Sequence, residues 1–541
     1  MIAILVFVCV LLFLYQIIIY PTFLSPLSKI PNAHPTSSIS SLWILFKRYH
    51  HQGTEALHEA HQTKGPILRV APNEISVNVV KGGLQTIYSG GFEKTNWYSA
   101  LENYGCLNMV SMLESGPHSV RKRMLSHIYS KSYLSTSQSL LAVATSVIHL
   151  QLLPRMAGAS QRSEPVDIYA LFERITLAWN ASYIFGAQAS TSDVLGQTGC
   201  VEFLQLYKER MKHLFWRMEV PGLTRWLERF FIRPVPKKCD EAHRELEKKV
   251  LKLCDGAANT YECFPDLTPN VFLQHLDKQH GFPLSHFPLV YAQLRSSLQR
   301  QSPKAKEGLS EDRRHEIASE LFDLLIAGFD TTSQTLTSLV AELCKPTNIH
   351  VQEALIAEVR SLNPPIKFNK FQDPRESMLH PLPSPRDVDA LPLLQAIIHE
   401  TLRLYEAVPG PQPRITPKGG CTIGPYTNIP GGVRINSQAY SLHRNADVFP
   451  DPLTWNPQRW LDSNGNFINN GEMHRWFWAF GSGGRGCVGK AFAMYQMVYA
   501  VAALFSNFRV RDGGEGEGMV FRKEIGRESE GQVLVLLECI D

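Results

Sequence analysis

The first hydrophobic feature of this chain is a continuous apolar run at its beginning. Ile2 to Tyr20 is almost wholly apolar, interrupted by a single glutamine, and has roughly the 20 residues that a helix needs to cross a bilayer. No Lys or Arg precedes the run, whereas Lys29, Lys47 and Arg48 follow it. The positive-inside rule therefore places the rest of the chain on the cytoplasmic side. We predict a single transmembrane anchor over residues 1–20.

A cleaved secretory signal is the alternative interpretation of this run. Such a signal has a basic start and a small-residue cleavage site, and the sequence Pro21 to Leu24 provides neither. Pro21, Pro26, Pro31 and Pro35 instead predict a stiff connector, because each proline fixes its own φ and biases the preceding residue toward an extended shape. Residues 21–59 are therefore expected to hold this connector and the first helix.

Beyond residue 60 the pattern predicts a few short strands and many amphipathic helices. Alternation predicts strands over 67–70 and 75–79 with a turn between them, a hairpin over 421–423 and 433–435, and a last strand over 533–537. Apolar residues at helical spacing predict helices over 117–129, 166–185, 202–231, 311–344, 351–362, 391–405 and 491–505. In 202–231 the large apolar residues predict a core stripe, with a mobile lid or a membrane-dipping surface as the alternatives. The proline-rich segment 363–385 predicts a surface loop, and a glycine-rich turn is expected at 513–518.

Composition narrows the class of protein. The 541 residues are 44% hydrophobic and 19% charged, which fits a globular protein with a large core, and the length alone favours two or more domains. A net charge of +4 gives no reason to expect nucleic acid. The ten cysteines are scattered and contain no C-x-x-C pair, as expected in a reducing compartment where one of them can serve as a ligand.

The segment Phe480 to Gly489 contains a single cysteine within a run of glycines, two residues after Arg485. Glycine lacks a side chain, so this loop can lie flat against a large planar ligand. The helix predicted directly behind it would present N–H groups and a positive dipole end, which favour a thiolate at Cys487. A thiolate against a flat ligand, with Arg485 available for a carboxylate, indicates a haem–cysteinate site. The alternative is a buried free cysteine in a strand-to-helix turn.

The predicted helix 311–344 is interrupted in sequence by Ala327-Gly328-Phe329-Asp330-Thr331-Thr332. Glycine and a pair of threonines are unfavourable inside a helix, and a threonine hydroxyl can bond the carbonyl of the preceding turn. We expect a local bulge that admits water or dioxygen beside a cofactor. A kink that serves only packing is the alternative.

These segments resemble the cytochrome P450 family, and in particular its fungal, membrane-anchored members. The family's haem-binding loop reads F-x-x-G-x-R-x-C-x-G, and its defined places are filled here by Phe480, Gly483, Arg485, Cys487 and Gly489. The stretch from Ala327 to Thr332 matches the family's A-G-x-[DE]-T-[TS] motif. The resemblance implies that Asp330 and Thr331 relay protons to dioxygen, with Thr332 in support.

The resemblance also implies structural and cofactor-binding roles for residues outside these two motifs. Glu400 and Arg403 match the family's Glu-x-x-Arg pair, which Arg459 of Pro457-Gln458-Arg459-Trp460 would complete as a buried cluster. The family has Trp-x-x-x-Arg bonding a haem propionate where this chain has His118 and Lys122. Arg414 matches a family arginine that contacts a propionate.

The implied fold is mainly α with a small β sheet, the cytochrome P450 fold, as one large catalytic domain over residues 60–541 behind the anchor. The implied activity is that of a haem-thiolate monooxygenase with haem b, which inserts one atom of O2 into a lipophilic small molecule, a terpenoid or polyketide-like intermediate of secondary metabolism. Electrons would come from NADPH through NADPH–cytochrome P450 reductase at the endoplasmic reticulum membrane.

Two details of the resemblance lead to further predictions. Arg485, Lys490 and the Arg121–Arg123 cluster are candidates for a cationic face on which the reductase docks, with an ordinary solvated face as the alternative. The pocket walls are expected from 96–115, 322–329 and 407–412, which are largely apolar. The alternatives for function are a haem-thiolate isomerase or dehydratase that needs no external oxygen, and a non-enzymatic membrane haem sensor or carrier.

Overall fold

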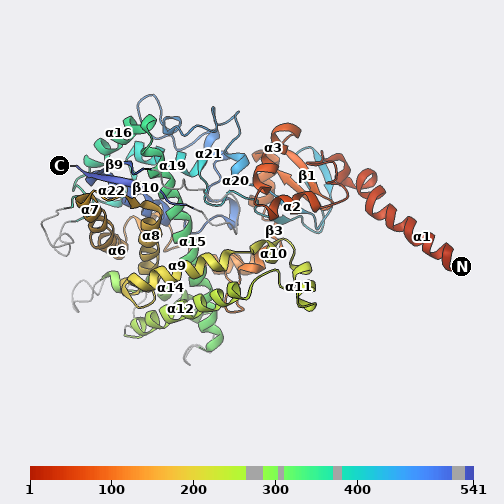
Figure 1. The fold of residues 1–541 in the computed structure, drawn as a ribbon, viewed down its shortest axis with the longest axis horizontal. Helices are drawn as coiled ribbons and strands as arrows, with labels where there is room; N and C mark the ends of the chain where they lie inside the picture. Colours follow the sequence, from red (N-terminus) through yellow and green to blue (C-terminus); the bar gives the residue numbers. More distant parts are fainter. Residues whose placement is uncertain (264–283, 302–309, 369–380, 515–530, 541) are drawn as a thin grey trace.

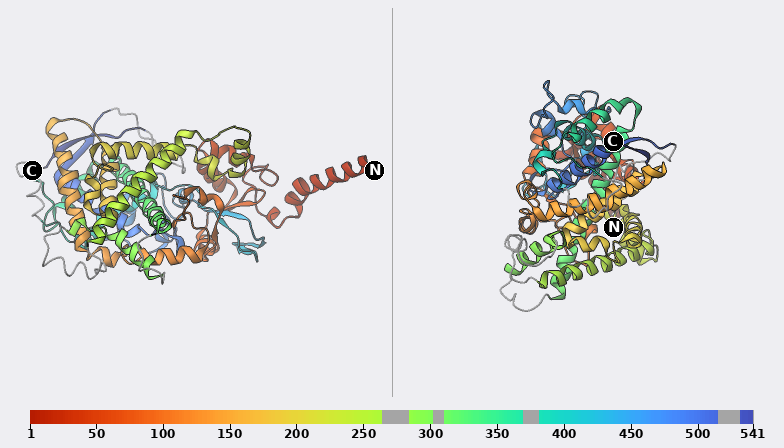
Figure 2. Two further views of the ribbon diagram at one scale, coloured as in Figure 1. Left: turned by 90° about the horizontal axis from the view of Figure 1, so that it is seen from below. Right: turned by 90° about the vertical axis from the view of Figure 1, so that its left-hand side faces the viewer.

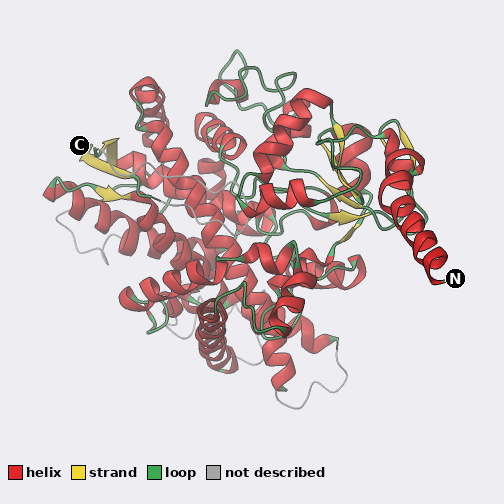
Figure 3. Ribbon diagram, turned by 45° about the vertical axis from the view of Figure 1, so that its right-hand side comes forward, coloured by secondary structure: helices red, strands yellow, loops and turns green. Residues whose placement is uncertain are grey.

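The computed structural model describes residues 1–263, 284–301, 310–368, 381–514 and 531–540. Helices dominate the molecule and the strands are few and short (Figures 1 and 3). The predicted proline-rich loop (363–385) and glycine-rich turn (513–518) lie partly outside the described residues. The body of the molecule forms one large domain, so the expectation of several domains from length alone is wrong.

The apolar N-terminal run forms a helix that projects away from the rest of the molecule (Figures 1 and 2). It consists of α1 (Ile2–Leu14) and the π-helical η1 (Tyr15–Leu24), and nearly all of its side chains are exposed. The span of 23 residues has a mean hydropathy of 3.1. Helical structure therefore continues through Pro21, past the end of the apolar run at Tyr20. A second helical stretch, Gln138–Arg162, is also apolar enough to cross a membrane, but it is largely buried within the fold.

Three small sheets hold the strands. The largest has five strands in the order β1 (Ile67–Ala71), β2 (Glu74–Val77), β8 (Arg434–Asn436), β5 (Arg414–Ile415) and β3 (Glu93–Lys94), and lies near the N-terminal helix (Figure 1). Only β2 and β8 pair in parallel within it. A three-stranded sheet joins β4 (Val166–Asp167), β10 (Leu534–Cys539) and β9 (Phe508–Asp512).

The hairpin predicted between 421–423 and 433–435 is wrong in its pairing. β6 (Cys421–Ile423) pairs with β7 (Tyr426–Ile429) in a separate two-stranded sheet, and β8 instead pairs with β2 and β5. The tight turn at Gly424, which has a φ of +55°, closes the observed hairpin. A positive φ costs glycine little, so the chain turns two residues after Thr422 rather than at Pro430.

The helices of the body form the following series. The longer ones are α2 (Leu42–Tyr49), α3 (Gly53–Lys64), α4 (Ser115–Leu125), α6 (Gln138–Val147), α7 (Leu153–Arg162), α8 (Ile168–Phe185), α9 (Gln197–Met211), α11 (Pro221–Arg229), α12 (Lys237–Glu262), α14 (Leu289–Arg300), α15 (Glu311–Leu343), α16 (Ile349–Arg360), α19 (Pro392–Leu404) and α22 (Lys490–Asn507). The short ones are α5 (Lys131–Leu134), α10 (Leu214–Met218), α18 (Pro385–Asp389), α20 (Ala439–Leu442) and α21 (Glu472–Trp476). Further 3-10 or π turns are η2 (Pro26–Lys29), η3 (Val80–Ser89), η4 (Asn96–Leu101), η5 (Ile148–Leu152), η6 (Ala187–Thr191), η7 (Leu284–His286), η8 (Pro346–Asn348), η9 (Pro457–Trp460) and η10 (Gly483–Arg485).

Helix α15 is the central element of the core. It contacts α8, α12, α14, α19 and α22, and Leu336, Leu339 and Val340 on its C-terminal half are fully buried. The helix begins where the Ser310 side chain accepts a hydrogen bond from the backbone N–H of Arg313, which satisfies one of the free donors of the first turn. The long helical period in the sequence is thus explained by burial on almost all sides.

The core stripe predicted for 202–231 is wrong for its C-terminal part. That segment is divided into α9, α10 and α11, and the side chains of Leu223, Trp226, Phe230 and Phe231 are exposed. The helix breaks explain the error, because one continuous helix would have kept these residues on the face that α9 buries. The exposed residues are consistent with the alternative of a membrane-facing surface.

Candidate active site

The glycine-rich segment 480–489 forms a tight loop that leads directly into α22. Gly483 has a φ of +68°, and a Cβ added there would lie 2.1 Å from the carbonyl oxygen of Tyr88. Only glycine therefore permits the loop to pack so closely against η3. The backbone N–H of Cys487 donates to the carbonyl of Phe480 (2.9 Å), so both ends of the loop are held together.

The sulfur of Cys487 combines accessible surface with dense surroundings. Its side chain is accessible to water, yet the surrounding protein is dense enough that desolvation raises the pKa of the thiol. The N–H groups of Gly489 and Lys490 and the ammonium group of Lys122 act in the opposite direction and lower that pKa. Negative charge at the sulfur thus has donors and a cation ready to stabilise it.

Helix α15 carries an open stripe on a surface that is otherwise buried. Asp323, Ile326, Ala327 and Thr331 retain accessible surface in the middle of the helix, and their spacing puts them on one face. Buried Tyr129 lies close to both Glu320 of α15 and Cys487, so the helix passes near the thiol.

The expected bulge in α15 is not observed. The helix is α-helical from Glu311 to Leu343, and the Thr331 hydroxyl donates to the carbonyl of Ala327 (2.8 Å) without opening it. Gly328 has a packing role instead, since a Cβ there would come within 1.9 Å of Asn180 Oδ1 on α8. The alternative of a glycine that serves packing is therefore the better explanation.

Asp330 and Thr331, predicted to relay protons, and Thr332, predicted to support them, face different sides of α15. Thr331 faces the open stripe, whereas Asp330 is buried and accepts a hydrogen bond from Gln334 Nε2 at Oδ1 (3.0 Å). Thr332 is also buried, and its hydroxyl forms no hydrogen bond within the described part of the chain. Of these three residues, Thr331 is the one on the open stripe.

Cationic side chains surround His118. Burial, followed by the charges of Arg485, Lys94, Lys122 and Arg414, lowers the pKa of His118 to about 3. Four cations around one imidazole form an electropositive site that is suited to carboxylate groups. Lys94 was not among the residues selected from the sequence, because a single lysine in a short strand has no distinguishing pattern.

Each of these cations is held by protein groups. Lys122 Nζ donates to the carbonyls of Gly484 (3.0 Å) and Gly486 (2.6 Å), so it supports the cysteine loop from α4. Arg485 donates to the carbonyls of Met112 and Leu113 and to Glu93. Arg414 donates through Nη1 to Tyr98 Oη and the carbonyl of Pro413, while its buried Nε has no partner in the described ranges.

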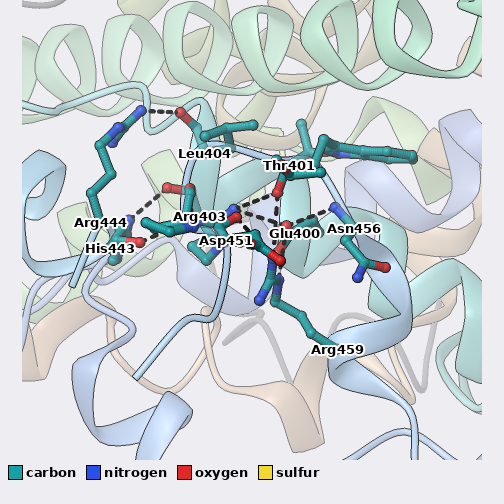
Figure 4. Close-up of polar contacts among 12 residues, drawn as sticks. Glu400, Thr401, Arg403, Leu404, His443, Arg444, Asp451, Asn456 and Arg459 are labelled. Atoms are coloured by element: carbon teal, nitrogen blue, oxygen red, sulfur yellow. Dashed lines mark hydrogen bonds and ion pairs between the residues drawn. The ribbon is translucent and has the colours of Figure 1, made fainter. Parts of the chain in front are cut away.

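The predicted cluster of Glu400, Arg403 and Arg459 is present and buried (Figure 4). Arg403 donates to both oxygens of Glu400 (2.8 and 2.9 Å), and Arg459 Nε donates to Oε1 (3.0 Å). The backbone N–H of Asn456 and the indole N–H of Trp460 complete the shell of donors around this carboxylate. Its charge is therefore fully compensated, as a buried charge requires.

His443 connects this cluster to the cysteine loop. Arg403 Nη1 donates to the carbonyl of His443 (2.9 Å), and the backbone N–H of Trp478 donates to His443 Nε2 (2.7 Å). Because Nε2 accepts a hydrogen bond, the proton of the neutral ring is on Nδ1, which donates to the carbonyl of Arg403 (2.9 Å). Burial lowers the pKa of His443 and so favours this neutral form. The loop that begins two residues after Trp478 is thereby fixed to α19.

Comparisons with known proteins agree with this site. The sequence profile of the cytochrome P450 family matches residues 33–534. Similar proteins include cytochrome P450 monooxygenase orf2 of Aspergillus niger (27% identical, covering 90% of this chain and 87% of the relative) and cytochrome P450 monooxygenase avaI of Aspergillus versicolor (26% identical, 82% and 95%). Tryprostatin B 6-hydroxylase of Neosartorya fischeri is 24% identical, covering 93% of this chain and 80% of the relative.

The helical domain and the accessible cysteine at the start of α22 agree with the family that these comparisons identify. The chain belongs to the cytochrome P450 family, and it is an oxidoreductase of the monooxygenase class.

The residues present fit the haem that the family implies. An accessible thiol supplies an iron ligand. Four cations lie around His118, and Glu93 pairs directly with one of them, Arg485. The buried Nε of Arg414 adds a donor without a protein partner among the described residues. Haem carries two carboxylates at one edge, so it would match both the donor set and the charge of the site.

Proposed function

We propose that this protein inserts one atom of O2 into a lipophilic small molecule, with Cys487 as the axial ligand of haem b and electrons from NADPH through NADPH–cytochrome P450 reductase. The observation that carries the proposal is the accessible Cys487 thiol at the start of α22, in a chain that belongs to the cytochrome P450 family. When bound, haem with a thiolate ligand supplies the activation of dioxygen.

The side chains of this protein have separate tasks in that reaction. The N–H groups of Gly489 and Lys490 would stabilise the Cys487 thiolate, and the cations around His118 would neutralise the haem carboxylates. The Thr331 hydroxyl would pass protons from water to the oxygen side of the pocket, because it lies on the open face of α15. Asp330, which is buried next to Thr331 on the same helix, would assist this proton transfer. Thr332 would support the packing of α15.

The class of substrate is proposed from the pocket and from the relatives. The open face of α15 includes Ile326 and Ala327, and an apolar wall favours lipophilic molecules. One relative is named a hydroxylase of tryprostatin B. We propose an intermediate of secondary metabolism, such as a terpenoid or polyketide-like molecule, for this chain.

The proposed reductase-docking face must be smaller than the sequence suggested. Arg485 and Arg121 are buried and engaged, the latter in ion pairs with Glu316 and Glu320. Arg123 and Lys490 are exposed and remain as candidates for contact with an acidic partner surface.

The reaction class can be tested on the purified full-length protein. We expect the reduced carbon monoxide complex to show the long-wavelength Soret band of a thiolate-ligated haem. We also expect NADPH, O2 and reductase to give a product with one added oxygen atom, labelled from 18O2. An isomerase or dehydratase would give a product without that label, and a sensor would give no product.

Replacing Thr331 with alanine is expected to separate electron consumption from product formation. Loss of the hydroxyl removes the proton donor on the open face, and positioned proton transfer contributes about a hundredfold or more to a rate. Product per NADPH consumed should fall steeply, with the electrons recovered as hydrogen peroxide. Thr331→Ser should retain the yield, and Thr337→Ser on the buried side of the same helix should match the wild type. An unchanged yield in Thr331→Ala would contradict the role.

We also propose that Ile2–Leu24 anchors the protein in the endoplasmic reticulum membrane, with the catalytic domain in the cytoplasm. Deleting residues 2–24 is expected to move the protein from the carbonate-resistant membrane fraction into the supernatant, because a run with a mean hydropathy of 3.1 is lost. The carbon monoxide spectrum should not change, since this helix projects from the body and touches it only near its end, where Arg69 of β1 bonds the carbonyl of Pro21 and Thr22 bonds Ser38 within the described residues. Retention of the truncated protein in the carbonate-washed pellet would contradict the anchor.

A further inference from the structure

Arg69 is a buried cation at the point where the N-terminal helix meets the body. It lies in the middle of β1, and its side chain is 1% exposed. Burial lowers the pKa of its guanidinium group, and no carboxylate in the described ranges lies within ion-pair distance to offset this. An unpaired buried charge destabilises a fold, and the apolar packing of the sheet gives no reason for one here.

The partners of Arg69 are backbone groups from segments on either side of it. Its Nη1 donates to the carbonyl of Pro21 (2.5 Å) and its Nη2 to that of Pro72 (2.8 Å). Its backbone N–H donates to the carbonyl of Pro31 (2.8 Å), and its own carbonyl accepts from the N–H of Ala33 (2.8 Å). One residue of β1 therefore holds both the end of the N-terminal helix and the connector behind it.

The carbonyl of Pro21 cannot obtain a donor from the helix itself. In η1 the N–H of Ser25 donates to the carbonyl of Tyr20. The next donor in this pattern would belong to residue 26, which is a proline and has no N–H. The guanidinium group of Arg69 takes the place of that donor, at the helix end where the dipole favours a cation.

The connector beyond the helix is also bound to the body. Leu27 and Ile30 are buried in the apolar cluster that contains Ile75 of β2. Lys64 Nζ, at the end of α3, donates to the carbonyl of Ala33 (2.6 Å). The connector is therefore part of the fold and does not act as a flexible linker, and the N-terminal helix projects from a fixed segment (Figure 2).

We propose that Arg69 joins the membrane anchor rigidly to the catalytic body and so gives the body one orientation relative to the bilayer. This inference rests on the anchor proposed above and names the residue that fixes its geometry. The partners of Arg69 belong to the anchor, the connector and the β1–β2 turn, so Arg69 is a positioning residue that is separate from the site around Cys487. A partner held in the same membrane, such as the reductase, would meet the same face of the body in every encounter.

Amide hydrogen exchange of the full-length protein in phospholipid nanodiscs tests the joint itself. Arg69→Met keeps a long side chain but removes its charge and its donors, whereas Arg69→Lys replaces the planar fork by a compact ammonium group. In Arg69→Met the amides of residues 22–40 should exchange about tenfold or more faster, because hydrogen bonds from a charged donor are lost. Arg69→Lys should give an intermediate rate. Arg511→Met removes an exposed arginine of β9 and should match the wild type.

The orientation of the body can be followed without an added label when haem is bound. Electron paramagnetic resonance of the ferric protein in stacked, oriented bilayers records how the spectrum changes as the membrane plane is turned in the magnetic field. The spectrum should depend strongly on this angle in the wild type and in Arg511→Met. Arg69→Met should lose the dependence, because its body swings on a loosened connector. Its unfolding midpoint and carbon monoxide spectrum should match the wild type.

The outcomes separate the joint from the proposals on which it rests. If carbonate washes the wild type from the membrane, the anchor is overturned whatever Arg69 does. If the carbon monoxide spectrum lacks the thiolate signature, the reaction class fails, while the exchange of residues 22–40 still tests the joint. An anchored wild type whose resonance spectrum is independent of angle overturns the joint, and so does an Arg69→Met variant that keeps either the exchange rates or the angular dependence of the wild type. A variant that unfolds earlier and exchanges faster throughout the body overturns it as well, because Arg69 would then be an ordinary core residue.

Discussion

Replacing Cys487 with serine is expected to abolish monooxygenase activity and to remove the long-wavelength Soret band of the reduced carbon monoxide complex. Cys487 is accessible at the start of α22, with the N–H groups of Gly489 and Lys490 directed at its sulfur. A serine hydroxyl stays protonated at neutral pH and is a poor donor of electron density to iron, so the chemistry that depends on a thiolate is lost. Absorption spectra and product formation with reductase and NADPH measure both effects.

The same substitution at another cysteine provides the control. Cys421 lies in β6 and is partly buried, so Cys421→Ser changes the same atom at a site remote from the loop. It should leave the spectrum and the activity as in the wild type. A normal spectrum for Cys487→Ser, or equal losses in the two variants, would remove Cys487 as the iron ligand.

The fold was most predictable where burial imposes a simple period on the sequence. Helix α15 and helix α22 are buried on most sides, and their apolar residues predicted them to within a few residues. Pairing between strands was less predictable, because the short alternating pattern of Cys421–Ile423 is compatible with several partner strands. The turn at Gly424 selects the neighbouring strand β7. Trp226 and Phe231 were predicted to lie in the core because large apolar residues are usually buried. Both are exposed in the structure.

Within the site, the short motifs were predictable and the electrostatic surroundings were not. The loop around Cys487 and the pair Glu400 and Arg403 are defined by fixed spacings along one chain segment. Lys94 and Asp323 become neighbours only through the tertiary fold, which brings β3 beside α15. A separate lysine and aspartate have no mutual pattern in sequence, so their proximity required the structure. The same holds for the separation of Asp330 from Thr331, which depends on how far α8 covers the face of α15.

Replacing Glu400 with alanine is expected to destabilise the fold by about 3–5 kcal/mol and to reduce the amount of haem that the purified protein retains. The substitution leaves the guanidinium groups of Arg403 and Arg459 buried without their carboxylate (Figure 4). The effect should extend to the cysteine loop, because Arg403 bonds the carbonyl of His443 and His443 bonds the backbone of Trp478. Unfolding midpoints and the ratio of haem to protein absorbance measure the two effects.

An ion pair of the same spacing on the surface is the matched control. Glu245 and Lys248 are also three residues apart but are exposed, so Glu245→Ala should leave the midpoint and the haem content unchanged. Replacing Glu400, Arg403 and Arg459 together by apolar residues of similar size should destabilise less than Glu400→Ala, because no buried charge is then left alone. If Glu400→Ala behaves like Glu245→Ala, the cluster does not hold the loop. If Glu400→Ala lowers the midpoint but leaves the haem content intact, the cluster supports the helices without reaching the cysteine, and the connection through His443 is refuted.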